Sequence, residues 1–299
     1  MSTSAEGRRG FLGSRAEGLA LLVFTGCSWG LTWPQSKFLL SLLPPFSMRA
    51  TCGVAGCAIA FLLAALRREP LVPPRGQWGR LLVFSMLNYG LFILLTAKAL
   101  SWMSASQTVV LTYTLPIWAS IFAWPMLGER PTPLRVLAIV LGLTGVTLLV
   151  NLGAPSAGPH ELAGAALALA AAMLFGVGTV IAKRKPLGMP PITAVAWQAL
   201  FGSMPVTLAA FTEAPRYDHM TPLGWAAVAY IAILPMTVSY LAWFRALRLV
   251  PASTAATTVL LSPLIGVAGS ALLLGETLGP RQVLGLVLTL TGVGLAARR

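Results

Sequence analysis

Long apolar runs alternate with short polar segments along nearly the whole chain. An α-helix needs about 20 apolar residues to cross roughly 30 Å of hydrocarbon. Most runs come close to that length, and the fifth and tenth are shorter. The pattern therefore predicts ten transmembrane helices, at residues 19–40, 46–66, 78–98, 105–127, 134–150, 162–182, 192–212, 222–244, 252–274 and 281–297.

The composition agrees with a lipid environment. Of the 299 residues, 57% are hydrophobic and only 10% are charged. The mean hydropathy is +0.80. A soluble domain of this length needs more polar surface to cover its core. We therefore expect an all-α integral membrane protein, in which residues 1–17 form a polar tail and the apolar run that follows is a retained first span rather than a cleaved signal.

The charge distribution predicts the direction of the spans. The formal net charge is +13, but the cations fall in short clusters between apolar runs, which excludes a nucleic-acid-binding face. With the N-terminus inside, sixteen Lys and Arg residues lie on the cytoplasmic side. We therefore expect a bacterial inner-membrane protein with both termini in the cytoplasm. The outer side keeps five cations: Lys37, Arg49, Lys98, Arg216 and Arg281.

Cysteine and histidine usage predicts neither a metal site nor a disulfide. Cys27, Cys52 and Cys57 lie inside apolar runs, with no metal-ligand spacing. The segment Gly26-Cys27-Ser28-Trp29-Gly30 fits the G-x-S-x-G pattern of serine hydrolases, which need a histidine and an acid nearby. His160 and His219 lie in predicted loops. An intramembrane serine hydrolase is therefore a remote alternative, and we predict no catalytic residue and no cofactor.

The chain contains an internal repeat. Shifting residues 99–146 by 147 positions onto 246–293 gives seventeen identities in 48 positions without a gap. The N-terminal parts agree more weakly at a shift of 146. The matches include Ala105-Ser106 with Ala252-Ser253, Pro116 with Pro263, Leu127-Gly128-Glu129 with Leu274-Gly275-Glu276, Lys37 with Lys183, and Pro44-Pro45 with Pro190-Pro191.

A repeat of five helices has an odd number of spans, so the second copy must enter the membrane from the opposite side. Inverted repeats of this kind allow two halves to exchange conformations around a central site, which is the basis of alternating access in transporters. We expect a first repeat at 18–151, a linker at 152–160 and a second repeat at 161–299. Pro116 and Pro263 are candidate hinges, although a static kink fixed by packing is an equal alternative.

The Leu-Gly-Glu tripeptide after a Pro-containing fourth helix, followed by a Gly-rich fifth helix and repeated in both halves, resembles the drug/metabolite transporter superfamily. Within it, the chain is similar to the ten-helix EamA-type members, and most to the bacterial amino-acid exporters of the YddG type. The resemblance covers about residues 18–297. It implies a ten-helix transporter with no cofactor, and the shared motifs concern the fold rather than the substrate.

Polar and aromatic residues on helix faces are the candidate substrate site. Such faces suit a wet cavity better than lipid. Interfacial anchoring is the alternative for the first-helix tryptophans, and a helix–helix hydrogen bond is the alternative for Asn88. The candidates are Trp29, Thr32 and Trp33 in the first span, Asn88, Tyr89 and Phe92 in the third, Tyr113 in the fourth, Phe175 and Thr179 in the sixth, and Met236, Tyr240 and Trp243 in the eighth.

These side chains favour a neutral, zwitterionic substrate such as an amino acid, including aromatic and hydrophobic ones. A drug or a nucleotide sugar is the alternative class. All eight acids lie in tails, loops or helix ends, so we expect export or exchange driven by the substrate gradient, without an embedded proton carrier. Arg49 is the one candidate partner for a substrate carboxylate, and snorkelling to the interface is the favoured alternative. The expected partners are the small-molecule substrate and the lipid bilayer.

Overall fold

The computed structural model describes residues 3–128, 132–149, 159–250 and 261–296, and all regular structure in these ranges is helical. The first half contains α1 (Thr3–Leu39), α2 (Pro45–Leu66), α3 (Trp78–Ser85), η1 (Met86–Gly90), α4 (Leu91–Trp102), α5 (Ala105–Thr112), α6 (Leu115–Leu127) and α7 (Pro133–Leu149). The second half contains α8 (Pro159–Arg184), α9 (Pro191–Ala210), η2 (Tyr217–His219), α10 (Pro222–Ile233), η3 (Leu234–Val238), α11 (Ser239–Leu249), α13 (Leu261–Leu274) and α14 (Pro280–Ala296).

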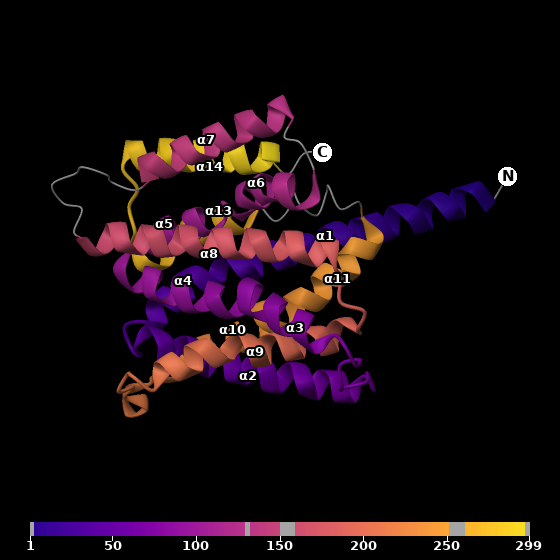
Figure 1. Ribbon diagram of the computed structural model, residues 1–299, viewed down its shortest axis with the longest axis horizontal. Coiled ribbons are helices and arrows are strands. Elements are labelled where there is room, and N and C mark those ends of the chain that lie inside the picture. The colour runs from indigo at the N-terminus through magenta and orange to yellow at the C-terminus, as the bar shows by residue number, and fades with distance from the viewer. Residues whose placement is uncertain (1–2, 129–131, 150–158, 251–260, 297–299) are drawn as a thin grey trace.

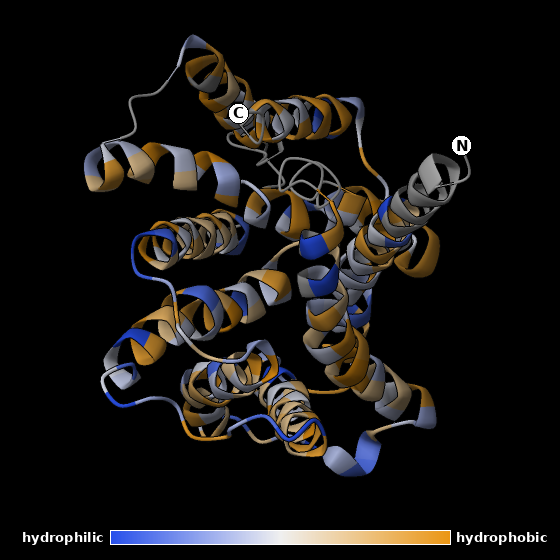
Figure 2. Cartoon of the chain, turned by 90° about the vertical axis from the view of Figure 1, so that its right-hand side faces the viewer, coloured by the Kyte–Doolittle hydropathy of each residue, from blue (hydrophilic) through white to orange (hydrophobic). Residues whose placement is uncertain are grey.

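The helices run roughly along one direction and stack side by side (Figure 1). Within the described ranges, six continuous helical stretches are long and apolar enough to cross a membrane, and three shorter apolar helices accompany them. Large apolar side chains lie on the outside of the bundle, among them Leu208, Phe211 and Leu272 at 65%, 81% and 84% exposure. Apolar residues colour helices throughout the bundle in Figure 2. The expectation of an all-α integral membrane protein is confirmed.

Most predicted spans coincide with helices, and the differences lie at their ends. Helix α1 begins at Thr3, so most of the expected polar tail is helical and forms the start of α1. The third and eighth spans reach Trp102 and Leu249. Helical hydrogen bonding does not stop where the apolar run stops, and Glu17, at the end of the polar segment of α1, pairs with Arg245 of α11. Residues 252–260 of the ninth span lie outside the described ranges.

Hydrogen bonds between helix termini define two ends of the bundle. At the first, Lys37 near the end of α1 donates to the carbonyls of Leu100 and Met103, at the end of α4, at 2.8 and 2.6 Å. Glu276, just after α13, binds the start of α5 here. At the second end, Gln77, before α3, donates to the carbonyl of Gly188, before α9. Glu69, just after α2, binds the start of α9 here. We call these ends the Glu276 end and the Glu69 end.

Carboxylates from one helix end complete the starts of other helices. The first backbone amides of a helix have no partner within it, and a carboxylate satisfies both their hydrogen bonds and the helix dipole. Glu69, after α2, accepts from the amide of Thr193 in α9 at 2.9 Å. Glu213, after α9, accepts from the amide of Ser47 in α2 at 2.7 Å. Each helix of this pair is thus capped by a residue that follows the other.

Two π-helical segments interrupt equivalent spans. The third span contains η1 and the eighth contains η3, each of five residues. A π-helical turn carries one extra residue, which shifts the faces of the helix on either side of it. The apolar pattern does not reveal these segments, because it fits a continuous α-helix equally well.

Candidate functional site

The two π-helical segments meet each other. The hydroxyl of Tyr89 in η1 donates to the sulfur of Met236 in η3 over 3.6 Å. Single-turn π-helical insertions occur frequently at functional sites. The contact brings together one predicted site residue from each half, and we call it the π junction.

Glycines on α2 and α9 make the π junction possible. A Cβ atom on Gly202 of α9 would lie 2.3 Å from Cδ1 of Tyr89. A Cβ atom on Gly56 of α2 would lie 3.0 Å from the sulfur of Met236. These two glycines correspond at the 146-residue shift found in the sequence. Each half therefore supplies one π-helical side chain and the glycine that accommodates the side chain of the other half.

An aromatic group flanks the π junction on the α1 side. The Trp29 indole donates to the carbonyl of Pro235, within η3, at 3.0 Å. Its ring packs against Tyr240 and Trp243 of α11, with centroid distances of 5.5 and 5.8 Å. Four predicted residues, Met236 included, are therefore gathered on η3, α11 and the facing side of α1.

Asn88, Phe92 and Phe175 lie together where η1 and α4 pack on α8. The Asn88 amide donates to the carbonyl of Phe84 in its own span at 3.3 Å and lies against Gly178. The rings of Phe92 and Phe175 are 5.2 Å apart. Thr179 is exposed, and its hydroxyl binds the Phe175 carbonyl. Asn88 thus bonds within its own span rather than to another helix.

Three further predicted residues lie on α1 and at the end of α5. Trp33 is 6% exposed and packs in an apolar cluster with Leu100 and Val109, against which Tyr113 also lies. The hydroxyl of Thr32 binds the carbonyl of Ser28 in the same helix. The apolar cluster joins α1 to α5, so Trp33 contributes packing between these helices.

The fourth span breaks next to a predicted hinge. Helix α5 ends at Thr112 and α6 begins at Leu115, so Pro116 lies in the first turn of α6, where a missing amide costs no helical bond. The hydroxyl of Thr114 binds the Leu111 carbonyl across the break. Pro263 lies in the first turn of α13, and the residues before α13 are outside the described ranges. Hinge motion at these prolines stays a prediction.

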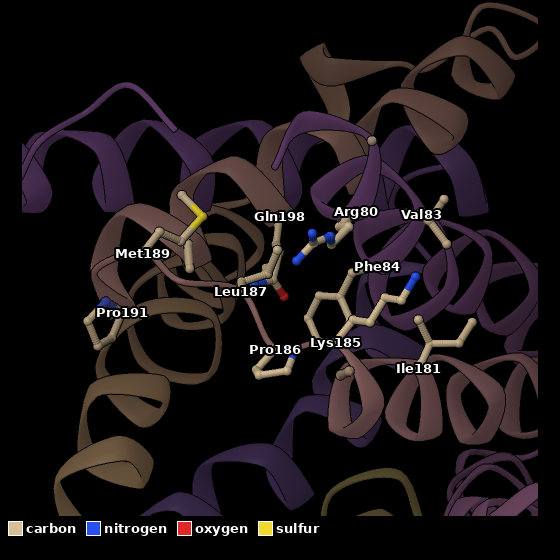
Figure 3. Close-up of a pocket in the computed structure, with 13 residues that line it drawn as sticks. Arg80, Val83, Phe84, Ile181, Lys185, Pro186, Leu187, Met189, Pro191 and Gln198 are labelled. Atoms are coloured by element: carbon tan, nitrogen blue, oxygen red, sulfur yellow. The ribbon is translucent and has the colours of Figure 1, made fainter. Parts of the chain in front are cut away.

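Two cavities lie at opposite ends of the bundle. One, of about 430 Å³, lies at the Glu69 end between α3, the end of α8 and the start of α9. Figure 3 shows Arg80, Lys185 and Gln198 among its lining residues. The other, of about 390 Å³, lies between α1, α10 and α13 and includes Gln35. Two walls of each cavity are equivalent in the repeat, α3 with α10 and α8 with α1, whereas the third wall is α9 in one and α13 in the other. Of the two linings, only the first includes cations.

The acids lie away from the π junction. Within the described ranges, Glu69, Glu213 and Glu276 bind helix starts, Glu17 pairs with Arg245, and Glu161 accepts from Gln107. No group of three or more potential metal ligands occurs in this part of the chain. The Ser28 hydroxyl is buried without a hydrogen-bond partner, while His160 stacks on Trp102 and His219 pairs with Asp218.

The profile of the EamA-like transporter family matches the chain twice, over residues 16–151 and 162–298. The chain belongs to the EamA-like transporter family. The two matches cover nearly all of the apolar spans described above, and they make this protein an integral membrane transporter.

Relatives within the EamA-like family align over most of their length. The chain is 28% identical over 276 residues to "Uncharacterized transporter YvbV" of Bacillus subtilis (strain 168), covering 92% of this chain and 90% of that protein. It is 29% identical over 303 residues to "Probable amino-acid metabolite efflux pump" of Salmonella typhimurium, covering 94% of each. A solved chain titled "Crystal structure of protein" shares the fold, with a TM-score of 0.64, 20% identity, and coverage of 92% and 96%.

Proposed function

We propose that this protein exports or exchanges small neutral metabolites, amino acids with aromatic and hydrophobic side chains above all, by alternating access. The observation that carries the proposal is the π junction, where Tyr89 and Met236 from the two halves meet beside Trp29 and Tyr240. Aromatic rings and a thioether offer polarizable apolar contact to a hydrophobic side chain. The phenol and indole groups add hydrogen-bonding capacity.

The relatives support a metabolite substrate. One carries the name of an amino-acid metabolite efflux pump and aligns with the chain over 94% of both lengths. A strongly anionic substrate such as a nucleotide sugar would require several cations near the junction. Arg80 and Lys185 instead line the cavity at one end of the bundle.

The architecture supports alternating access between two inverted repeats, at 18–151 and 161–299. Glu69 caps α9 and Glu213 caps α2, so equivalent contacts recur at opposite ends of the bundle. Inverted-topology repeats in transporters place the substrate site at their interface. The cation excess at the Glu69 end supports a cytoplasmic position for that end and for both termini, in a bacterial inner membrane.

The absence of a described acid at the π junction supports transport driven by the substrate gradient. Proton- or cation-coupled carriers commonly use an embedded carboxylate as the titrating group. Here the described carboxylates of the spans serve helix starts at the two ends of the bundle.

Counterflow in proteoliposomes tests the proposal. Vesicles containing the full chain are loaded with one unlabelled amino acid, and entry of the radiolabelled form is followed for a panel of amino acids. We expect faster entry than in empty liposomes, without an imposed pH gradient. Failure of every amino acid in the panel would refute the amino-acid proposal, and movement of a drug or nucleotide sugar in parallel vesicles would replace it.

A further inference from the structure

Arg49 is a buried cation without a partner. It lies near the start of α2 and is 9% exposed, and its Nε is buried with no hydrogen-bond partner. No hydrogen bond or ion pair of Arg49 occurs in the part of the chain that the structure describes. An unpaired charge buried in a protein within the bilayer is costly, and such groups mark functional sites.

The sequence favoured an Arg49 side chain that snorkels to the membrane interface. The side chain is instead buried. Arg216 and Arg245, in contrast, keep 70% and 65% of their side chains exposed and pair with acids. An acid is available close to Arg49, since Glu213 binds the amides of Phe46 and Ser47 on the same helix. The Glu213 carboxylate caps the start of α2, and it forms no ion pair with the Arg49 guanidinium.

The fold does not require a cation at this place. At the 146-residue shift, Ser47 corresponds to Thr193 and Arg49 corresponds to Val195. Thr193 is capped by Glu69 as Ser47 is capped by Glu213. Helix α9 therefore forms the same capping contact with valine where α2 has arginine, so that contact does not depend on the charge.

Arg49 adjoins the π junction. Arg49 and Gly56 lie two turns apart on the same face of α2, and Gly56 meets Met236 of the junction. Tyr89 contacts Met236 there, and Tyr240 packs against Trp29 beside the junction. A guanidinium binds a carboxylate through two parallel hydrogen bonds, which makes arginine the preferred partner for that group.

We propose that Arg49 binds the carboxylate of the transported molecule, while the side chain of that molecule lies against Tyr89, Met236 and Tyr240. The inference rests on the proposed function, because it assigns one half of the amino-acid site. In this proposal Arg49 selects for a carboxylate, and the aromatic and thioether side chains bind the apolar group of the substrate.

The test compares an amino acid with its primary amide, which keeps the ammonium and side chain but lacks the carboxylate. In wild-type counterflow we expect the acid to compete roughly tenfold to a hundredfold better than the amide, the range for a charged hydrogen-bonded contact. Arg49→Gln should remove that preference, and Arg49→Lys should keep part of it. Arg281→Gln, which changes an exposed cation of α14, should leave the preference unchanged.

Three results would overturn the inference while leaving amino-acid transport intact. They are a wild type that does not prefer the acid, an Arg49→Gln variant that keeps the preference, and an equal loss of acid and amide transport in a folded variant. The wild-type comparison remains decisive if Arg49→Gln does not fold.

A binding measurement separates this inference from the proposed function. The thermal stability of the wild type is followed with phenylpropionate, a carboxylate without an ammonium group, and with its amide. If no amino acid is transported but phenylpropionate, and not its amide, stabilises the wild type and fails to stabilise Arg49→Gln, Arg49 keeps its assignment and the substrate class changes. Equal stabilisation by the carboxylate and the amide would overturn the assignment.

Discussion

Glu276 and Ser106 share two hydrogen bonds: one carboxylate oxygen accepts from the Ser106 amide at 3.0 Å and from its hydroxyl at 2.7 Å. The other oxygen accepts from the amide of Ala105 at 2.7 Å. The carboxylate follows α13 and the serine begins α5, so the contact joins the two halves of the chain. It involves the glutamate of the Leu-Gly-Glu tripeptide and gives that motif a physical role at the Glu276 end.

Glu276→Ala should destabilise the protein by about 1–3 kcal/mol, because it leaves the first amides of α5 without a partner. Ser106→Ala should cost less, since the backbone contacts remain. Unfolding in detergent measures both effects. Glu17→Ala is the matched control, because its exposed ion pair with Arg245 contributes at most about 1 kcal/mol. Equal losses in Glu276→Ala and Glu17→Ala would contradict this account of the motif.

Gly275→Ala should cost about 1 kcal/mol or more. Gly275 has φ +68°, a left-handed conformation that alanine adopts only with strain, although no atom lies near its missing Cβ. Gly79→Ala is the contrasting control: Gly79 lies in α3, also without near atoms, and alanine should stabilise that helix by about 0.5–1 kcal/mol. Changes of the same sign in both variants, measured by thermal unfolding, would refute the conformational argument.

The apolar pattern predicted an all-helical membrane protein and the approximate limits of most spans, because burial in lipid depends on local composition. It also placed Trp29 and Tyr240 on apolar helices that proved to face each other. The pattern could not indicate η1 and η3, since a π-helical turn depends on packing between distant helices. For the same reason it did not reveal that Glu69 and Glu213 cap helices of the opposite half.

The largest revision concerns Arg49. Its position close to a helix end favoured an interfacial side chain, because an isolated arginine reaches water whenever its length allows. The side chain is instead 9% exposed, on a helix that packs against α9 and α10. Repeat comparison offered a signal, since the equivalent position of the second half carries an uncharged residue, Val195.

Gly202→Ala should impair the protein far more than Gly56→Ala. The new methyl group of the first would collide with the ring of Tyr89 at 2.3 Å, and overpacking of this kind costs about 1–3 kcal/mol. The new methyl group of Gly56→Ala would lie about 3.0 Å from the sulfur of Met236, whose flexible side chain can adjust. Counterflow should fall strongly in Gly202→Ala and mildly in Gly56→Ala. The reverse order would argue against the described geometry of the π junction.

Trp29→Phe should reduce transport more than stability. The substitution removes the indole hydrogen bond to the Pro235 carbonyl, a contribution of about 1 kcal/mol, and keeps most of the aromatic packing on Tyr240. Initial counterflow rates and unfolding temperatures, measured on the same preparations, separate the two effects. Trp124→Phe, at a tryptophan 56% exposed on α6, should change neither. Unaltered transport in Trp29→Phe would exclude Trp29 from the site.

The inverted arrangement of the two halves is tested most directly by cysteine labelling in intact cells. Thr132 and Gly279 are equivalent in the repeat, and both are exposed at the starts of α7 and α14. Single cysteines at these positions, in a chain whose three native cysteines are replaced, are treated with a membrane-impermeant maleimide. We predict labelling of the cysteine at 279 in intact cells and of the cysteine at 132 only after permeabilisation. Labelling of both from the same side would contradict the inverted repeat.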